Sequence, residues 1–296
     1  MNKLGLVLGG GGGLGSYEIG VWKALREYNI DKQIKAISGA SVGVLNACLM
    51  AQNDYTIAEH IWTNEIEDKI LSKKKIDSKN KSISANGIFT REGLLEIIDK
   101  YLNIEVVSNC EYPIYAAAVN LDSIDVEYFK LNGKSVKEIK EIMMATSAIP
   151  IIFGRQKING VNYIDGGVEF LNGNNLPLTP LYEYGCDEII VVNLYRDAIV
   201  EKSETCKVYE IVPNEDIGTF TNGGLDFSLD GAMYRIERGY TDTMEILKAV
   251  FEFKSMEDEI NYMSSKIKDY NIKSCNDRRK LKSELYRAID DLKIDD

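Results

Sequence analysis

The sequence predicts an α/β fold, a three-layer sandwich in which helices flank a largely parallel central sheet. Three observations lead to this prediction. Short apolar stretches alternate with helix-length stretches from the first residues onward. The longer stretches repeat apolar side chains at helical spacing, whereas the short ones are apolar throughout, as in strands buried on both faces. Such alternation favours parallel strands joined by helices that cover both faces of the sheet.

The N-terminal part of the chain follows this alternation most clearly. A strand, a helix, a second strand and a second helix are predicted at residues 3–8, 17–28, 34–38 and 42–52. The first helix is indicated by Ile19, Trp22 and Leu25, which recur every three residues and so share one helix face. The glycine-rich residues 9–15 form the loop between the first strand and this helix.

The remaining elements continue to about residue 253. Further helices are predicted over 55–71, 90–102, 135–145 and 230–253, and further strands over 112–121, 126–131, 188–194 and 208–212. Asn159-Gly160 predicts a hairpin over 157–164, because this dipeptide accepts the positive φ angles of a two-residue turn. Residues 255–296 are strongly charged and lack apolar periodicity. The sequence therefore predicts one domain over 1–254 and a charged helical C-terminal extension over 255–296.

The composition excludes several classes of protein. Thirty-five basic and 46 acidic residues give a net charge of −11, which argues against nucleic acid as a partner. The five cysteines are widely spaced and form no C-x-x-C motif, so we expect reduced thiols and no zinc site. The apolar N-terminus runs directly into glycines, unlike a signal peptide, and no stretch approaches the roughly 20 apolar residues of a membrane span. We expect a cytoplasmic protein that can contact a membrane peripherally.

Three motifs carry the chemistry, and two of them lie between a strand and a helix. The first is the glycine run Gly9–Gly13, continued by Leu14 and Gly15. Without Cβ atoms, its backbone N–H groups can converge on a phosphate or an oxyanion, and the following helix adds positive potential. The second motif, at residues 39–43, is G-x-S-x-G, a nucleophile elbow that exposes the hydroxyl of Ser41 at the carboxyl end of a strand.

A serine nucleophile needs a base, and the single histidine does not fit this role. His60 follows Ser41 by 19 residues within a helical pattern, whereas α/β-hydrolases place their histidine late in the chain. The third motif supplies an alternative: Asp165, followed by two glycines, ends a predicted strand. An aspartate within hydrogen-bonding reach can accept the serine proton directly. Because its ordinary pKa lies near 4, desolvation has to make it a better base.

The order of the three motifs, G-G-G-x-x-G, then G-x-S-x-G, then D-G-G, resembles the patatin-like phospholipases. Three further stretches are similar to that family's segments around D-G-G, namely Ala-Thr-Ser-Ala-Ile-Pro at 145–150, Asn-Asn-Leu-Pro at 174–177, and Gly-Cys-Asp-Glu-Ile-Ile-Val-Val at 185–192. The resemblance covers residues 3–195, with a weaker match over 230–253. It implies a patatin-like fold and a lipid acyl hydrolase that cleaves carboxylic esters of phospholipids, lysophospholipids or related lipids.

The resemblance also implies a Ser–Asp dyad and an acyl-serine intermediate, without a metal or cofactor. Carried over to this chain, Ser41 is the nucleophile and Asp165 the base. Backbone amides of the glycine loop form the oxyanion hole, at the positions Gly10, Gly11 and Gly12. One departure is Leu14, which stands where the family commonly has Arg or Lys. The help that such a cation gives in holding the loop or meeting a phosphate is therefore absent from that position.

Two other interpretations of the glycine loop fit less well. Gly10, Gly12 and Gly15 match the dinucleotide-binding G-x-G-x-x-G, but no carboxylate ends the second strand to hold a ribose. A Walker A loop lacks its Gly-Lys-Ser/Thr. A non-catalytic lipid-binding or scaffold protein with the same fold stays open as the alternative to an enzyme.

The segment from Lys69 to Lys81 is strongly basic. Six lysines and one aspartate fall between residues 69 and 82. Such a run attracts anionic head groups, so transient contact with a membrane surface is one expectation. A solvated loop is the other. The oligomeric state cannot be predicted from these features.

Overall fold

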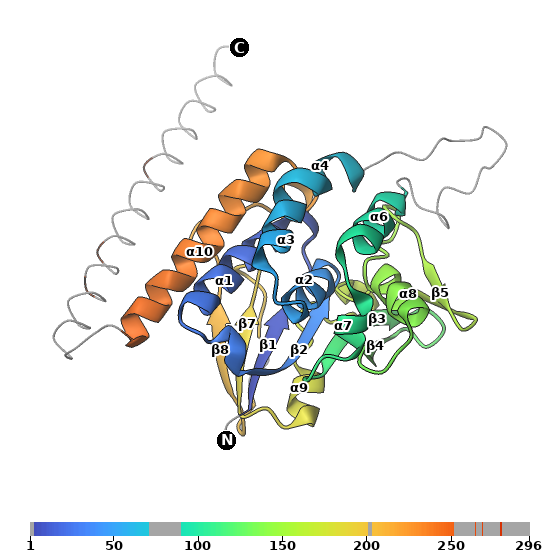
Figure 1. Ribbon diagram of the computed structural model, residues 1–296, viewed down its shortest axis with the longest axis horizontal. Helices are drawn as coiled ribbons and strands as arrows, with labels where there is room; N and C mark the ends of the chain where they lie inside the picture. Colours follow the sequence, from blue (N-terminus) through green and yellow to red (C-terminus); the bar gives the residue numbers. More distant parts are fainter. Residues whose placement is uncertain are drawn as a thin grey trace, which may run out of the picture. The chain divides into compact units, whose positions relative to one another are not determined.

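The structure is a computed structural model that describes residues 3–70, 90–200 and 203–251, and the single positions 264, 268 and 279. Its centre is one eight-stranded sheet (Figure 1). The strands are β1 (Leu4–Leu8), β2 (Ile34–Ala40), β3 (Ile114–Asn120), β4 (Asp125–Lys130), β5 (Gln156–Ile158), β6 (Val161–Asp165), β7 (Glu188–Val192) and β8 (Lys207–Ile211). The predicted α/β class is confirmed.

The sheet is mixed, with its parallel strands adjacent to one another. The strand order is β5-β6-β3-β2-β1-β7-β8, and β4 pairs with β3 beside this path. Strands β3, β2, β1, β7 and β8 are mutually parallel, as predicted for the larger part of the sheet. The pairs β3–β4, β3–β6 and β5–β6 are antiparallel. The hairpin predicted at Asn159-Gly160 is the β5–β6 turn.

Helices surround this sheet. They are α1 (Ser16–Glu27), α2 (Val42–Ala51), α3 (Tyr55–His60), α4 (Ile66–Lys69), α6 (Glu92–Tyr101), α7 (Ile104–Ser108), α8 (Val136–Thr146), α9 (Thr179–Tyr184) and α10 (Leu229–Phe251). Helix α2 packs on β1 and β2, and α8 packs on β3, β5 and β6. Helices α7 and α9 were not predicted. A π-helix, η3 (Ile61–Glu65), joins α3 to α4 within the single helix predicted there.

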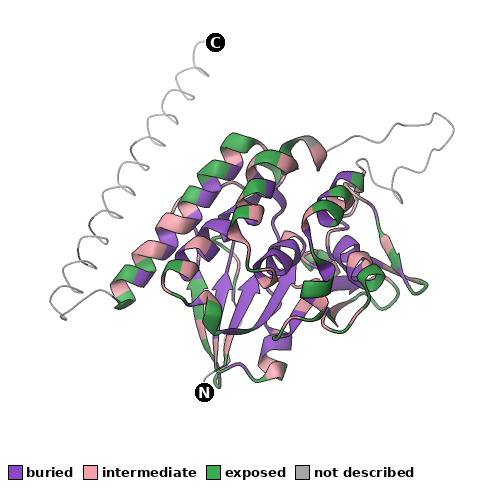
Figure 2. Ribbon diagram, viewed as in Figure 1, coloured by how far each residue is buried: buried purple, intermediate pink, exposed green. Residues whose placement is uncertain are grey.

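The core lies on both faces of the central strands. Leu6, Val7 and Leu8 are completely buried, which explains why β1 contains no polar side chain. Val7 belongs to a cluster that includes Leu181 of α9 and Ile189 of β7. Figure 2 shows β1, β2 and β7 as almost entirely buried strands. Apolar side chains on both faces therefore hold the sheet between its covering layers.

The chain divides into two compact units, Met1–Met244 and Glu245–Asp296. The first unit contains the whole sheet and every residue of the candidate site. The predicted domain limits, 1–254 and 255–296, stay a prediction, because residues 255–296 lie outside the described residues apart from three single positions. Among the described helices, none is both long enough and apolar enough to cross a membrane.

Candidate active site

Ser41 occupies a strained turn between β2 and α2. Its φ and ψ angles are 52° and −124°, a region that residues with a Cβ rarely adopt. The two flanking glycines make room for this turn. A Cβ on Gly43 would lie 2.3 Å from the carbonyl oxygen of Leu8, and one on Gly39 would lie 2.8 Å from the backbone of Gly43. The G-x-S-x-G sequence therefore builds a nucleophile elbow, with Ser41 at the N-terminus of α2.

The backbone of the elbow is held by Thr146 at the end of α8. The Ser41 N–H donates to the Thr146 hydroxyl at 2.8 Å, and that hydroxyl donates to the carbonyl of Ala117 at 2.5 Å. Thr146 is 1% exposed, so water does not compete for either hydrogen bond. The first bond gives the buried Ser41 N–H a partner outside the sheet, and the second connects the turn to β3.

Asp165 reaches Ser41 because β2 and β6 meet end to end along one edge of β3. Strand β2 pairs with β3 as far as Ala40–Ala117, and β6 pairs with it as far as Asp165–Ala118. Strand β4 pairs along the other edge of β3. The last residues of β2 and β6 therefore stand at consecutive positions of the same strand. This register brings the two predicted residues together although they lie far apart in the sequence.

The Asp165 carboxyl is buried and incompletely hydrogen-bonded. Its exposed fraction is 4%, and Oδ1 accepts the Gly167 N–H at 2.8 Å. Among the described residues, no donor completes a hydrogen bond to Oδ2. Burial raises the pKa of Asp165 to about 6, although the nearby Ser41 hydroxyl and the Gly167 N–H oppose the rise. Asp165 is therefore a stronger base than an exposed aspartate, as the proposed proton transfer requires.

The glycine loop lies next to this pair. Gly10, Gly11 and Gly12 all line the cleft that Ser41 and Asp165 also line. Asn175 clamps the first of them: the Gly10 N–H donates to Asn175 Oδ1 at 3.1 Å, and Asn175 Nδ2 donates to the Gly10 carbonyl at 3.1 Å. Gly12 begins a 3₁₀ turn, so its N–H has no partner within that turn.

A second glycine-containing segment, residues 223–226, lies against this loop. At Gly12, whose φ is 57°, a Cβ would lie 2.2 Å from the carbonyl oxygen of Gly224. At Gly13 a Cβ would lie 2.1 Å from the carbonyl oxygen of Asp226. The two backbones approach so closely that only glycine fits at these positions. The glycines of this loop thus allow the two backbones to pack closely, and they also leave the loop N–H groups accessible.

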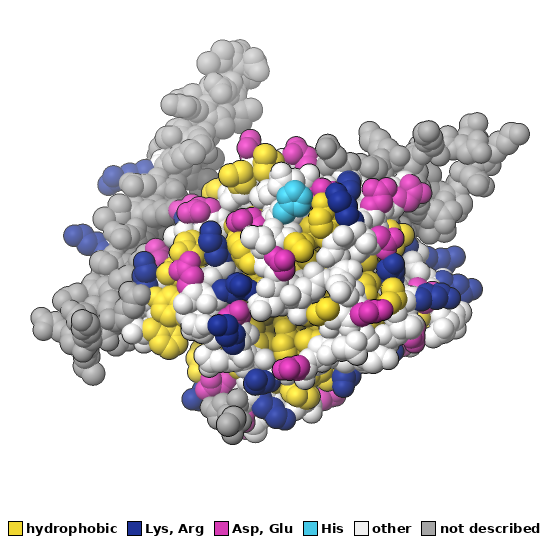
Figure 3. Space-filling view, in the orientation of Figure 1, with side chains coloured by type: hydrophobic (Ala, Val, Ile, Leu, Met, Phe, Trp, Pro, Cys, Tyr) yellow, Lys and Arg dark blue, Asp and Glu magenta, His cyan; other side chains and the backbone are white. Residues whose placement is uncertain are grey.

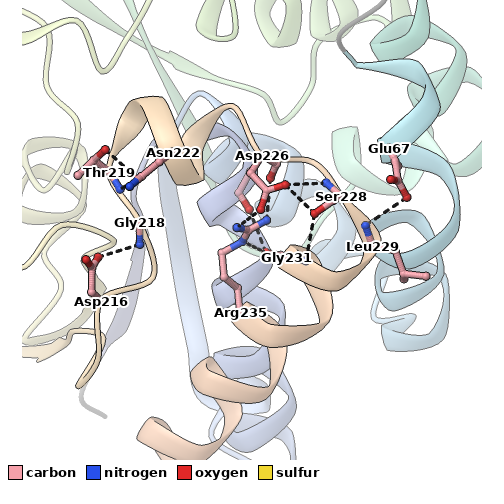
Figure 4. A network of polar contacts seen from close by, with 12 residues as sticks. Glu67, Asp216, Gly218, Thr219, Asn222, Asp226, Ser228, Leu229, Gly231 and Arg235 are labelled. Atoms are coloured by element: carbon pink, nitrogen blue, oxygen red, sulfur yellow. Dashed lines mark hydrogen bonds and ion pairs between the residues drawn. The ribbon is translucent and has the colours of Figure 1, made fainter.

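A buried arginine holds the second segment against the loop (Figure 4). Arg235, on α10, is 2% exposed and pairs with Asp226 Oδ2 at 3.0 Å. Its Nε donates to the Ser16 hydroxyl at 2.9 Å, and that hydroxyl donates to the Gly13 carbonyl at 2.9 Å. Leu14, which replaces a cation in the motif, is completely buried. A cation does hold the loop, but it comes from α10.

A second set of buried polar groups also supports the loop. Glu18 on α1 is completely buried, and its Oε2 accepts the Asn46 Nδ2 at 2.7 Å. Asn46 Nδ2 also donates to the Gly15 carbonyl at 2.9 Å, and Asn46 Oδ1 accepts the Trp62 Nε1 at 3.1 Å. Burial raises the pKa of Glu18 well above its ordinary value.

His60 is not part of this arrangement. It ends α3, its side chain is 48% exposed, and Figure 3 shows it on the surface. Its Nε2 lies 3.3 Å from the hydroxyl of Tyr101 and 3.7 Å from Glu65. His60 lines neither cavity that reaches Ser41. This position agrees with the expectation that His60 is not the base for Ser41.

Two cavities meet at Ser41 and Gly12. One is apolar and lies between α2, α4, α6 and α8. Its walls include the apolar side chains of Leu45, Trp62, Leu94, Ile98, Met143 and Phe153. The other is an open cleft, where Asp165 and the glycine loop lie. The arrangement can hold an apolar chain on one side of Ser41 and a polar group on the other.

Sequence reasoning assigned no role to three residues of the site: Thr146, Asn175 and Arg235. The first two fall in stretches that carry the family resemblance, which is a signal for their importance but not for their contacts. Arg235 falls only in the weaker match over 230–253 and looks like an ordinary helical arginine. Its partner Ser16 is 219 residues away in the chain. Pairings of this kind become visible only in the folded protein.

The chain belongs to the patatin-like phospholipase family, whose model matches residues 6–182. It is also similar to lysophospholipase NTE1 from two strains of Cryptococcus neoformans var. neoformans serotype D, each 27% identical over 192 residues. That match covers 65% of this chain and 11% of each relative, so the chain spans about a tenth of their length.

Two solved structures are also similar. VipD from Legionella pneumophila matches at 13% identity and a TM-score of 0.45, over 84% of this chain and 67% of that one. The type III effector protein ExoU matches at 15% identity and the same TM-score, over 84% of this chain and 53% of that one.

Proposed function

We propose that the protein is a lipid acyl hydrolase that cleaves carboxylic esters with a Ser41–Asp165 dyad. The observation that carries this proposal is the register of β3, which brings the strained serine and the buried aspartate to adjacent positions. Membership of the patatin-like phospholipase family supports the lipid substrate class. The three motifs and the geometry thus favour the same chemistry.

In the acylation step, the Ser41 Oγ attacks the carbonyl carbon of the ester while Asp165 accepts the hydroxyl proton. The raised pKa of Asp165 matches it to this transfer near neutral pH. Negative charge develops on the carbonyl oxygen. The N–H groups of Gly11 and Gly12, together with the N-terminus of α2, stabilise it. The Gly10 N–H donates to Asn175, so we assign Gly10 to holding the loop in place.

Collapse of the tetrahedral intermediate releases the alcohol part of the lipid, which takes the proton from Asp165. An acyl group then remains on Ser41 Oγ. Water attacks this acyl-serine, Asp165 accepts a proton from the water, and Ser41 recovers that proton when the fatty acid departs. Atoms and charge balance in both steps with the residues of this chain alone.

The two cavities suggest how the substrate is oriented. The apolar cavity fits an acyl chain, because its walls are almost entirely hydrocarbon. The open cleft fits the alcohol and head group, because it is wider and contains polar groups. The lysophospholipases among the relatives make a single-chain phospholipid the first substrate to try. One apolar cavity beside Ser41 agrees with that choice.

The test is release of fatty acid from lysophosphatidylcholine, followed by mass spectrometry, with the wild type, Ser41→Ala and Ser147→Ala. Ser147 also lines the apolar cavity, but its hydroxyl donates to the Met143 carbonyl. We expect release by the wild type and by Ser147→Ala, and none above background by Ser41→Ala. A folded wild type that binds lipid without releasing fatty acid would support the scaffold alternative and refute the proposal.

A further inference from the structure

Four exposed apolar side chains surround the mouth of the open cleft, and we call them the apolar rim. They are Ile199, Phe170, Ile151 and Phe220, with exposed fractions of 91%, 81%, 62% and 38%. They come from four separate segments of the chain. Single exposed apolar residues are common on protein surfaces, but a set that converges on one opening indicates an interaction site.

The rim residues lie in turns, loops and short helices of the chain. Ile151 has a φ of 68°, a strained conformation for a β-branched residue, in the turn that follows α8. Phe170 lies in a 3₁₀ turn, η4 (Glu169–Leu171), and Phe220 begins the π-helix η5 (Phe220–Gly224). Beside Ile199, the carbonyl of Ala198 accepts the buried Asn193 Nδ2 at 3.2 Å. All four rim side chains therefore lie outside the sheet and the longer helices.

The charges inside the rim are all negative. Among the described residues, the charged side chains that line the cleft are Asp165, Glu169 and Asp197. Arg196 precedes Asp197 in the chain but does not line the cleft. An anionic surface would be repelled at this opening, whereas a zwitterionic one would meet the carboxylates with its cationic groups.

We propose that the apolar rim inserts into the surface of zwitterionic lipid, so that a lipid can pass from that surface to Ser41. The inference rests on the proposed function, which supplies the reason for lipid to enter. The rim residues line the cleft, and the cleft shares Gly12, Ser41 and Ile149 with the lining of the apolar cavity. A lipid tail that leaves a membrane meets the apolar side chains of the rim first and those of the apolar cavity beyond Ser41.

This surface differs from the basic segment that the sequence suggested. Most of Lys69–Lys81 lies outside the described residues, and the Lys69 ammonium pairs with Glu65 at 2.8 Å. The two surfaces predict opposite lipid preferences. Docking through lysines requires anionic lipid, whereas docking through the rim proceeds on phosphatidylcholine alone and weakens when anionic lipid is added.

The experiment is flotation with phosphatidylcholine vesicles, and with vesicles of phosphatidylcholine and phosphatidylglycerol in equal parts. All proteins carry Ser41→Ala, so that turnover does not alter the vesicles. The rim variant is Phe170→Ser with Ile199→Ser. The control is Val106→Ser, which replaces a side chain on α7 that is 40% exposed and lines a separate cavity with Ile34, at the start of β2.

We expect the parent and the control to float with phosphatidylcholine, and the rim variant to partition at least about tenfold less, because two large apolar side chains are lost. We also expect weaker flotation on the mixed vesicles. Equal flotation of parent and rim variant, or flotation that requires phosphatidylglycerol, would overturn the proposal. So would a parent dimer that the rim substitutions convert to monomer without any vesicle binding.

Vesicle binding and fatty acid release are measured separately, so the rim and the proposed function can be refuted independently. Vesicle binding by the Ser41→Ala parent needs no chemistry, so a parent that floats beside a wild type that releases no fatty acid would contradict only the proposed function. A wild type that releases fatty acid from dispersed lysophosphatidylcholine beside a Ser41→Ala parent that never floats would contradict only the rim. Unfolding temperatures of all variants establish that exposed substitutions leave the fold intact.

Discussion

The hydroxyl of Thr146 accepts the backbone N–H of Ser41 at 2.8 Å and donates its own proton to the carbonyl of Ala117. One side chain of α8 thereby links the nucleophile elbow to the strand that also positions Asp165. The two residues of the hydrogen bond are 105 positions apart in the chain. Ser41 is thus held by its backbone, while its hydroxyl stays available in the cleft.

Replacement of Thr146 tests this support. Thr146→Val keeps the shape but leaves the Ser41 N–H and the Ala117 carbonyl unpaired in a buried place. We expect a loss of about 1–3 kcal/mol in the free energy of unfolding and a fall of roughly tenfold or more in kcat. Thr146→Ser retains the hydroxyl and should keep most activity. Equal activity of the Val and Ser variants would show that the hydrogen bonds are not needed.

Asp165→Asn removes the base while it keeps the shape of the side chain. Because a positioned base contributes at least about 10²-fold, we expect kcat to fall by that factor or more. The rate of fatty acid release measures it. Near-normal turnover would contradict the role of Asp165.

The same substitution should stabilise the protein at high pH. Burial raises the pKa of Asp165 from 3.8 to about 6, so the folded state favours the neutral acid. That stabilising preference is fully present at low pH and is lost as the pH rises through 6, after which the folded protein carries a buried charge. An amide avoids this cost, which is at most about 3 kcal/mol. Denaturant unfolding at pH 8 should show the Asp165→Asn variant to be more stable than the wild type, with little difference at pH 4. Equal stability at both pH values would mean that the carboxyl is not desolvated.

The pH profile of the wild type follows from the same group. Asp165 must be ionised to accept the Ser41 proton, so kcat/KM should rise with pH, turn near pH 6, and level off above it. Below the turn the rate should fall about tenfold per pH unit. If kcat/KM falls only below pH 4, the group that controls the rate is an ordinary exposed carboxylate instead of Asp165.

We expect Arg235 to affect kcat because it holds the glycine loop in place. Arg235→Met removes the cation that joins Asp226 and Ser16, so the second glycine segment loses its tie to Gly13. We expect a lower kcat with a smaller change in KM, because the loop amides act on the developing oxyanion. Lys207→Met, which breaks a surface pair with Glu188, is the matched control and should leave kinetics unchanged. A change in KM alone would argue for substrate binding instead.

Much of the fold could be predicted where local sequence specifies local structure. Strand β1 is apolar throughout, the elbow needs its glycines within two residues of Ser41, and the Asn-Gly turn lies between β5 and β6. Helix α9 was missed because six residues beginning Thr179-Pro180 show less than two turns of periodicity. The antiparallel direction of β6 was not predictable either, since strand direction depends on how the chain returns to the sheet.

The sequence motifs single out Ser41 and Asp165, but not the residues that hold them and the glycine loop in place. Ser41 and Asp165 each stand in a motif that local spacing reveals. Asn175 clamps Gly10 across 165 residues of chain, and no periodicity records such a pairing. The raised pKa of Asp165 was expected from the need for a base, but the extent of the burial that causes it is visible only in the folded structure.

The most direct test of the Ser41–Asp165 dyad is mass-spectrometric mapping of the residue that a fluorophosphonate probe modifies. The dyad predicts one adduct, on the peptide that contains Ser41, absent in Ser41→Ala and formed much more slowly in Asp165→Asn. Ser147, which shares the apolar cavity, should stay unmodified. An adduct on Ser147, or no adduct on the folded wild type, would contradict the account.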